Sequence, residues 1–411
     1  MIFLSKLQES INKGGEKVMK KKICFVVQRY GLEVNGGAEL QCRQLAEHIS
    51  EFYDVTVLTT KAIDYVTWRD EYLADDEIIN GVKVLRFGVE RERDMEVFSK
   101  EVIEFYDGAF QTEREQIKWL ENQGPYVPAL LSYIKKYKND YDVFVFFTYL
   151  YYTTVMGIKE VAQKAIVIPD AHDEPFLAMI PCQNVFKLPQ AIFYNTEEER
   201  QLIEEKITEA CLISDIGGVG IEVPAKTDGD SFSRKYHLEN YMIYVGRIDV
   251  GKNCHILFDY FQRYKHRNPN NLKLVLMGRN EIAVPQNDDI VNLGFVSDED
   301  KFAGIAEADF LILPSEFESL SMVILEAFAM EVPVLVNGVC NVLRSHCLKS
   351  NGGLYYKNYE EFEGCVNYML NHPAECKAMG MNGSVYVAEN YKWSVIVDKL
   401  GKLIEFVADR R

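Results

Sequence analysis

Short apolar runs alternate with helical patterns along most of the chain. Apolar runs bounded by glycine, proline or polar residues are typical of buried parallel strands. In the first half of the sequence they predict strands at residues 23–27, 55–59, 82–87, 142–147, 165–169 and 191–195. The segments from Gly36 to about Glu51 and from Val127 to Tyr137 have the spacing of amphipathic helices. This alternation predicts an α/β domain with a largely parallel sheet.

The alternation begins again in the second half. There the runs predict strands at residues 242–245, 272–278, 290–296 and 309–313, and the residues after 359 are expected to be helical. Between Asp215 and Asn240 the periodicity lapses and glycine, proline and aspartate gather, which marks a linker. We therefore predict two Rossmann-like, doubly wound domains that face a cleft, over residues 21–215 and 241–390, with a linker over residues 216–240.

The first twenty residues are expected to form an extension outside these domains. Their apolar run, Ile2–Leu4, is too short for a secretory signal, and Met19 has the setting of a second start just before the first strand. No segment reaches the roughly 18 apolar residues that a membrane-spanning helix needs. The chain is therefore not expected to span a membrane.

Two glutamates flank the turn that follows the strand at residues 309–313. Glu318 lies in the turn, and Glu326 lies inside a helix expected to begin at Ser321, whose hydroxyl is a candidate N-cap. Glu326 would then lie roughly 7 to 8 Å along the helix axis from its start, where backbone N–H groups and the dipole favour an anion. The spacing fits a nucleotide sugar, whose sugar and ribose hydroxyls lie on opposite sides of a diphosphate. The alternative is that both glutamates decorate a loop and a helix face.

Glycines and cations follow two other predicted strands. Gly36 and Gly37 lie at a helix start after the first strand, where glycines let a backbone approach a phosphate, although two glycines are also an ordinary turn. Arg247 and Lys252 flank a glycine turn after the strand at residues 242–245. Cations in that place clamp a diphosphate, and the alternative is two surface charges.

Polar and aromatic residues follow the strands at residues 142–147 and 165–169. His172 lies in a polar cluster after the second of these strands and is either a site residue or a structural hydrogen-bonding group. Tyrosines at 149, 151 and 152 lie where open α/β sheets bind ligands. They either stack on an acceptor sugar or belong to the core, and the core is favoured.

The motifs of the second half resemble those of a known family. Pro314-Ser315, Glu318, seven intervening residues and Glu326-Ala327, with Val332-Pro333-Val334 downstream, look like the Glu-x7-Glu signature of retaining GT-B glycosyltransferases, in particular glycosyltransferase family 4. Gly246-Arg247 followed by Lys252 is similar to the family's Gly-Arg-x-x-x-x-Lys signature. The resemblance covers about residues 20 to 405 and is strongest in the second half.

The resemblance implies roles for the residues that match. The two cations would neutralise the leaving diphosphate, which Gly36 and Gly37 would face across the cleft, and the last helix, residues 391–411, would cross back onto the first domain. His172 and Glu318 would orient the donor sugar, and Glu326 would hold the ribose hydroxyls. The expected catalytic residues are His172, Arg247, Lys252 and Glu318. The expected nucleotide-sugar-binding residues are Gly36, Gly37, Arg247, Lys252, Gly278, Gly294, Phe295, Val296, Glu318, Ser319, Leu320, Ser321, Met322 and Glu326.

The chain departs from the family's pattern in two places. Ser319-Leu320-Ser321 stands where many members have Gly-Phe-Gly, and serine is small enough to keep the turn. Asn337-Gly338-Val339-Cys340-Asn341 stands where the family often has Gly-Gly-x-x-Glu, so the ligand contacts of that segment are not implied.

The net charge limits which partners the protein can bind, and the cysteine content indicates its cellular compartment. A formal net charge of −17 argues against a nucleic acid partner, and any peripheral contact with a membrane would need a local basic patch. The nine cysteines show no Cys-x-x-Cys pair, which indicates a reducing, cytoplasmic compartment and no zinc site. No Asp-x-Asp stands beside the predicted diphosphate site, so we expect no metal and no cofactor.

The sequence therefore predicts transfer of a sugar from a UDP- or GDP-linked donor to a glycan, lipid-linked or protein acceptor, as in surface polysaccharide or glycoconjugate synthesis. Two alternatives remain open. One is a GT-B nucleotide-sugar epimerase or hydrolase, which would consume the donor alone. The other is a non-catalytic GT-B subunit that binds a glycan or a partner, for which loss of Arg247, Lys252 or Glu326 would be the expected mark.

Overall fold

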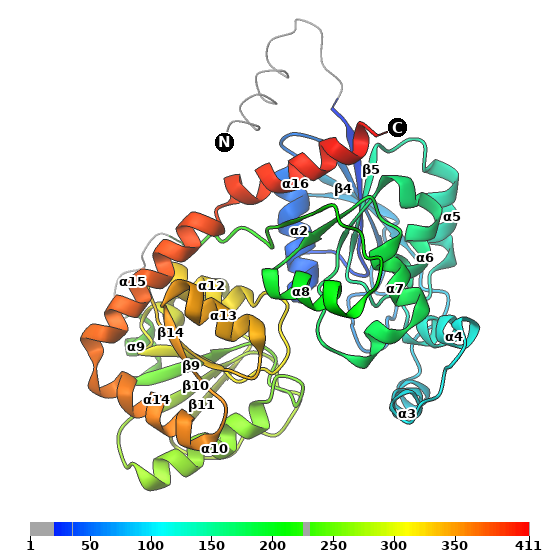
Figure 1. Ribbon diagram of the computed structural model, residues 1–411. Helices are drawn as coiled ribbons and strands as arrows, with labels where there is room; N and C mark the ends of the chain where they lie inside the picture. The colour runs from blue at the N-terminus through cyan, green and yellow to red at the C-terminus, as the bar shows by residue number, and fades with distance from the viewer. Residues whose placement is uncertain (1–19, 35, 225–230, 411) are drawn as a thin grey trace, which may run out of the picture. The chain divides into compact units, whose positions relative to one another are not determined.

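The computed structural model describes residues 20–34, 36–224 and 231–410, and the chain divides into two compact units (Figure 1). Unit 1 extends to Val219 and also contains Trp393–Arg411, and unit 2 comprises Gly220–Lys392. The predicted extension over residues 1–20 lies outside the described residues except for Lys20. Residues 225–230 of the predicted linker also lie outside them.

Unit 1 contains an eight-stranded sheet in the order β3-β4-β2-β1-β5-β6-β7-β8. Neighbouring strands are parallel except β3, which pairs antiparallel with β4. The strands are β1 (Lys22–Val26), β2 (Asp54–Thr60), β3 (Asp76–Ile79), β4 (Val82–Phe87), β5 (Val143–Phe147), β6 (Ala165–Ile168), β7 (Ala191–Tyr194) and β8 (Ser214–Ile216).

Helices cover both faces of this sheet (Figure 1). Several begin where the sequence supplies a cap: Thr112 and Glu115 form a capping box at the start of one, and the Thr196 hydroxyl accepts from the Glu199 N–H at the start of another. The helices are α2 (Gly37–Ile49), α3 (Met95–Tyr106), α4 (Glu113–Gln123), α5 (Pro128–Tyr137), α6 (Tyr152–Val161), α7 (Ile180–Lys187), α8 (Glu197–Lys206) and α16 (Trp393–Ala408), with 3-10 turns η1 (Ala162–Lys164) and η2 (Pro175–Ala178).

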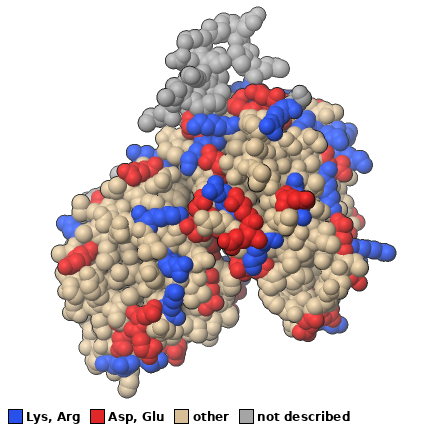
Figure 2. Space-filling model, viewed as in Figure 1, with Lys and Arg blue, Asp and Glu red and all other residues tan. Residues whose placement is uncertain are grey.

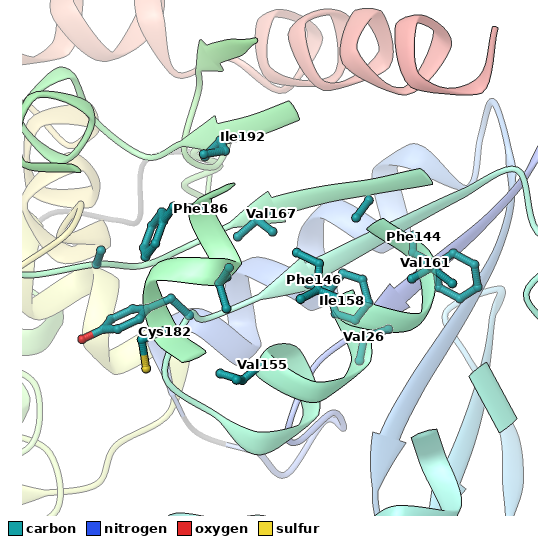
Figure 3. Packing of buried hydrophobic residues seen from close by; sticks show 14 of the residues in the cluster. Val26, Phe144, Phe146, Val155, Ile158, Val161, Val167, Cys182, Phe186 and Ile192 are labelled. Carbon is teal, nitrogen blue, oxygen red and sulfur yellow. The ribbon is translucent and has the colours of Figure 1, made fainter. Parts of the chain in front are cut away.

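The core of unit 1 lies between the sheet and helices α4 to α7. Alternate residues of β5, Phe144 and Phe146, point to the same side, where α6 contributes Ile158 and Val161 (Figure 3). Helix α16, from the end of the chain, packs against α2 and β5 to β8. The strands are buried on both faces, which explains their nearly unbroken apolar sequences.

Unit 2 contains a six-stranded, all-parallel sheet in the order β11-β10-β9-β12-β13-β14. The strands are β9 (Tyr241–Val245), β10 (Lys273–Met277), β11 (Ile290–Gly294), β12 (Phe310–Leu313), β13 (Val334–Asn337) and β14 (Gly353–Tyr356). The helices are α9 (Ser231–Tyr236), α10 (Cys254–Arg267), α11 (Asp298–Ala306), α12 (Met322–Ala329), α13 (Asn341–Ser350), α14 (Tyr359–Asn371) and α15 (Pro373–Asn390).

Both sheets are doubly wound, so each has a switch point where successive connections run in opposite directions. In unit 1 the switch point lies between β1 and β5, and in unit 2 it lies between β9 and β12. Ligands of open α/β sheets bind outside the carboxyl ends of the strands at such points. The predicted α/β class with two Rossmann-like sheets is confirmed.

The structure contains elements that the sequence did not predict. They are strands β3, β8, β13 and β14 and helices α6, α7 and α13. Helix α9 lies inside the predicted linker and packs against α11, because Phe232 is an apolar anchor in an otherwise polar stretch.

Charge is mixed on the surface shown in Figure 2, where acidic and basic side chains are interspersed and acidic side chains gather over α8. Among the described residues, no helix combines the length and apolar character that crossing a membrane requires.

Candidate functional site

The carboxyl edge of the unit 2 sheet brings together the two predicted motif loops. Residues 246–253 follow β9 and residues 314–321 follow β12, and these two strands are neighbours at the switch point. The loops are tied to each other, since the Asn253 side chain donates to the Pro314 carbonyl at 3.3 Å. Asn337, after β13, donates to the same carbonyl at 3.0 Å. The motif loops therefore form one edge of the sheet.

Lys252 and Glu318 form an ion pair across this switch point. Lys252 Nζ lies 2.6 Å from Glu318 Oε1, and their side chains are 26% and 13% exposed. The Lys252 N–H donates to Asp249 Oδ1 at 2.6 Å, so the backbone of the lysine is also fixed. A predicted phosphate-binding cation and a predicted sugar-orienting carboxylate thus contact each other.

Arg247 lies in the same loop with its guanidinium largely in solvent. Its side chain is 59% exposed and pairs with Asp249 at 3.3 Å. Its carbonyl accepts from the Tyr244 hydroxyl at 2.5 Å, which holds the backbone while the side chain stays accessible. The arginine can therefore turn toward an anion at this edge at little cost.

The turn before α12 has a geometry that the sequence did not predict. Ser321 occupies the N-cap position with φ of 67°, in the left-handed region that favours glycine. Its hydroxyl makes no capping bond and has no hydrogen-bond partner among the described residues, so the predicted serine cap is wrong. A glycine would adopt this backbone conformation without the strain that a serine carries.

His346 of α13 fixes the same turn from behind. The buried ring contacts the Leu320 carbonyl through Nε2 at 2.8 Å, so Nε2 carries a proton. Nδ1 lies 3.2 Å from the Tyr386 hydroxyl. The backbone from Ser319 to Met322 is thereby held at the start of α12. Sequence reasoning missed His346, because only its place inside a helix of mixed polarity marks it.

Glu326 lies inside α12 and is almost fully buried. Its Oε1 lies 3.0 Å from Lys301 Nζ of α11. Burial raises the pKa of Glu326, and the Lys301 charge acts in the opposite direction. The carboxylate is therefore held beside a cation in a poorly solvated place, where hydrogen bonds from a ligand's hydroxyls would be strong. Lys301 was not predicted from the sequence.

Gly278, after β10, and Gly294, at the end of β11, differ in the space around the missing Cβ. A Cβ on Gly278 would lie 1.9 Å from the Gly246 carbonyl oxygen, so close backbone approach requires this residue. Gly294 has φ of 67° and open space around its missing Cβ. Phe295 is 74% exposed beside it, and Val296 is half-buried. Gly294 and its neighbours thus offer an open backbone edge, and Gly278 lets the backbone after β10 approach that of Gly246 closely.

Gly36 and Gly37 lie in unit 1, at the start of α2. A Cβ on Gly36 would lie 2.0 Å from Glu39 Oε2, whereas Gly37 has nothing within 4 Å of the same point. Glu39 forms a buried ion pair with Arg29 at 2.7 Å. The first turn of α2 therefore already carries a neutralised carboxylate, and Gly37 is the open position of the pair.

His172 also lies in unit 1, in the loop after β6. Glu199 of α8 holds this loop, because its carboxylate accepts from the backbone N–H groups of Ala171 and Asn195, each at 2.6 Å. Asp170 has φ of 50° and accepts from the Asn195 side chain at 2.7 Å. Burial raises the pKa of Asp170 to about 7. The sequence marked Glu199 only as an acid in a first helical turn.

Unit 2 thus brings together Arg247, Lys252, Glu318 and the turn before α12, with Glu326 farther along that helix. Gly36, Gly37 and His172 belong to the other sheet. Of the tyrosines after β5, Tyr149 and Tyr152 are buried in the core and Tyr151 is half-buried.

Solved structures of similar fold define the class of architecture. Sucrose-phosphate synthase from Thermosynechococcus elongatus superposes with a TM-score of 0.71 at 16% identity, covering 95% of this chain and all of that chain. HepE from Anabaena, in complex with UDP-glucose, gives a TM-score of 0.67 at 14% identity, covering 94% and 99% of the two chains. These likenesses and the two doubly wound sheets show the GT-B fold.

The second unit also matches a sequence family. Residues 227–385 match the family described as "Glycosyl transferases group 1". The capsular polysaccharide biosynthesis glycosyltransferase CapM of Staphylococcus aureus is 25% identical over 188 residues, which cover 42% of this chain and 49% of CapM. An uncharacterized glycosyltransferase of Methanocaldococcus jannaschii, MJ1607, is 27% identical over 168 residues, covering 38% and 43%. The chain thus spans about half the length of these relatives.

Proposed function

We propose that this protein is a retaining glycosyltransferase that moves a sugar from a nucleotide diphosphate sugar to an acceptor. The observation that carries the proposal is the Lys252–Glu318 ion pair at the switch point of unit 2. In this proposal the cation binds a diphosphate and the carboxylate binds a sugar. The proposal is supported by the position of the pair in the part of the chain that matches a glycosyltransferase family. A UDP-glucose complex of the structurally similar HepE supports a nucleotide-sugar donor.

In this proposal Lys252 acts on the leaving group. Cleavage of the bond to the sugar leaves negative charge on the diphosphate, and fixed cations and N–H groups there are commonly the largest catalytic contribution. Lys252 would exchange Glu318 for a phosphate oxygen when the donor binds. Arg247, being exposed, would add a second cation, and the N–H groups from Ser319 to Met322 would add donors.

The carboxylates act on the hydroxyls of the donor. Glu318, once released by Lys252, would accept hydrogen bonds from the transferred sugar, and His172 is assigned to the same sugar by the family resemblance. Glu326, beside Lys301, would accept from the ribose hydroxyls. The backbone around Gly278, Gly294, Phe295 and Val296 is assigned to the base, and Gly36 and Gly37 are assigned to the diphosphate.

The proposal also covers the acceptor, the cellular location and the metal requirement of the reaction. The name of CapM supports synthesis of a surface polysaccharide, with a glycan, lipid-linked or protein acceptor. The cysteines of the described residues are free thiols, which supports a cytoplasmic location. We assign no metal and no cofactor to the reaction, so full activity in excess EDTA is expected, and its loss with recovery on adding Mg²⁺ would contradict this.

The donor is tested with a panel of UDP- and GDP-linked sugars. A true donor binds the native state and raises the melting temperature, and NMR of the product then reports whether the anomeric configuration is retained. Product analysis with and without acceptor separates a transferase from an epimerase or hydrolase, which would consume the donor in both cases. Binding of no nucleotide sugar would favour a non-catalytic subunit instead.

A further inference from the structure

Unit 1 has its own switch point, between β1 and β5, and three loops meet at that edge of the sheet. Arg29 follows β1, Tyr151 follows β5, and the loop carrying Tyr65 and Trp68 follows β2, which neighbours β1. Trp68 contacts Tyr151 edge-on with ring centroids 5.5 Å apart. The edge that binds ligands in open α/β sheets is therefore lined here by aromatic rings.

Arg93, from the loop between β4 and α3, lies among these rings and is 6% exposed. Its guanidinium carbon is 4.8 Å from the Trp68 ring centroid and 5.4 Å from that of Tyr65. Its Nε and the Trp68 indole N–H both donate to the Gln123 carbonyl, each at 2.8 Å. The arginine–aromatic cluster consists of Arg93, Tyr65, Trp68 and Tyr151.

Arg93 differs from the other buried arginines of unit 1 in lacking a carboxylate. Arg29 pairs with Glu39, and Arg86 pairs with Glu77. Within the described residues no Asp or Glu lies within ion-pair distance of Arg93, and its buried Nη2 has no hydrogen-bond partner. The Asp64 charge raises the pKa of Arg93, but the Asp64 carboxylate accepts hydrogen bonds from Thr67.

A buried guanidinium with an open donor is an unfavourable arrangement in the free protein. Desolvation penalises the charge, and contact with aromatic faces offsets only part of the penalty. Burial lowers the pKa of Arg93, whereas Tyr65 and Tyr151, including a polar contact of the guanidinium with the Tyr65 side chain, act in the opposite direction. A guanidinium stays protonated at neutral pH in any case. Such a cost is usually retained where the group binds a ligand.

Tyr65 is the member of the cluster that borders solvent. It is 39% exposed, whereas Trp68 and Arg93, which it contacts, are buried. A ligand that reaches Nη2 would have to displace a side chain, and Tyr65 is the most exposed member of the cluster. The rings then left beside the guanidinium suit the apolar face of a sugar.

We propose that the arginine–aromatic cluster binds the acceptor, and that the acceptor is a sugar carrying an anionic oxygen group, a phosphate or a carboxylate. The anion accepts a hydrogen bond from Arg93 Nη2 and the sugar ring packs against Trp68 and Tyr65. The assignment as acceptor site rests on the proposed glycosyltransferase function, whereas binding of the anionic sugar does not.

The test is a binding titration of the full chain with glucose 6-phosphate, glucuronate and glucose, in the presence of saturating UDP so that the unit 2 loops are occupied. Trp68 is one of three tryptophans, so quenching of tryptophan fluorescence reports on the cluster, and Trp68→Phe should remove most of the signal. We expect glucose 6-phosphate or glucuronate to bind at least tenfold more tightly than glucose. The two anions distinguish a phosphate from a carboxylate.

Arg93→Met keeps much of the packing volume and removes the charge. We expect it to abolish the preference for the anionic sugar, Arg93→Lys to restore part of it, and Arg86→Met, a buried but ion-paired arginine, to leave it unchanged. The melting temperature of Arg93→Met without ligand should equal or exceed that of the native chain, because no ion pair is broken, whereas Arg86→Met should lower it. If Arg93 had a purely structural role, the melting temperature of Arg93→Met without ligand would instead lie below that of the native chain.

Equal affinity for glucose and both anions, or an unchanged preference in Arg93→Met, would overturn the proposal. Failure of the proposed function gives a different result. In that case UDP and nucleotide sugars do not bind, while the anionic sugar still binds to the native chain and to Lys252→Ala. Loss of anionic-sugar binding in Lys252→Ala but not in Arg93→Met would place the anion in unit 2 and contradict the assignment.

Discussion

Individual charges in unit 2 are paired before any ligand binds. Lys252 is paired with Glu318 and Lys301 with Glu326, so both motif glutamates are held by lysines from other elements. Removing a cation from such a pair leaves a partly buried carboxylate without compensation. Each lysine therefore has a structural role in the free protein as well as the ligand role proposed for Lys252.

Lys252→Ala should reduce kcat on the order of a hundredfold or more, by analogy with loss of one donor to a developing anion. Lys273→Ala is a matched control, because Lys273 is similarly exposed and ion-paired but lies at the start of β10, on the opposite edge of the same sheet. Steady-state kinetics of both variants with the donor found by the panel measure the effect. Near-normal turnover of Lys252→Ala would remove it from the mechanism.

Asp170 should make unit 1 more stable in acid. Its pKa is raised from 3.8 to about 7 in the folded chain, so the folded state binds the proton more tightly than the unfolded state. This stabilisation of the folded state is fully present below pH 3.8, the pKa of Asp170 in the unfolded chain, and is lost as pH rises through about 7. Asp170→Asn keeps an acceptor for Asn195 and carries no charge. It should be more stable than the native chain above pH 7, by on the order of a few kcal/mol.

Melting temperatures of both chains between pH 4 and pH 8 test this expectation. The difference between them should grow with pH. Part of it comes through Glu199, because burial and the Asp170 charge both raise the pKa of that carboxyl group, and Asp170→Asn removes the charge. Parallel curves at every pH would show that Asp170 does not titrate in this range.

The sequence predicted which side chains lie together at the candidate site only where the residues follow a strand directly. Arg247, Lys252 and Glu318 lie in loops after β9 and β12, and the carboxyl ends of neighbouring parallel strands must meet. Lys301 contacts the Glu326 side chain, 25 positions away in the sequence. His346 contacts the Leu320 carbonyl, 26 positions away. No local spacing marks such pairs, because they depend on how α11 and α13 pack.

At the level of elements, most of the buried apolar strands were predictable, whereas the edge strands β3, β8 and β14 were not. β5 and β12 are entirely buried and their sequences are nearly all apolar. β3, β8 and β14 contain acids, serine or glycine within three or four residues, because they lie at or next to a sheet edge and bury less surface. Their pairing partners, and not their own sequences, make them strands.

Alanine substitutions at Gly278 and Gly294 test how closely the backbones at the carboxyl ends of β9, β10 and β11 approach one another. Gly278→Ala would place a methyl group against the Gly246 carbonyl, with φ of 143°, so we expect unit 2 to lose about 3 kcal/mol or more. Gly294→Ala meets no atom and costs only the left-handed conformation, about 1 to 2 kcal/mol. Thermal unfolding of the two variants should rank them in this order, and equal losses would mean that β9 and β10 separate easily.

Across the whole molecule, the two sheets share a topology and differ in the charge at their switch points. The edge of unit 2 offers the cations Arg247 and Lys252 with compensating acids, which suits a ligand that exchanges one charged partner for another. The edge of unit 1 offers a guanidinium among rings without a compensating acid. The same fold can therefore hold two chemically different ligands, one on each sheet.

This division predicts a selective effect of UDP on unfolding. Two compact units are expected to give two calorimetric transitions, and the one that Gly278→Ala lowers belongs to unit 2. UDP at a hundred times its Kd should stabilise that unit by about 2.7 kcal/mol and raise its transition, because it binds only the folded site. Lys252→Ala should abolish the shift and Lys273→Ala should not. A UDP shift confined to the other transition would place the nucleotide on unit 1 and contradict the assignment of the diphosphate to Lys252.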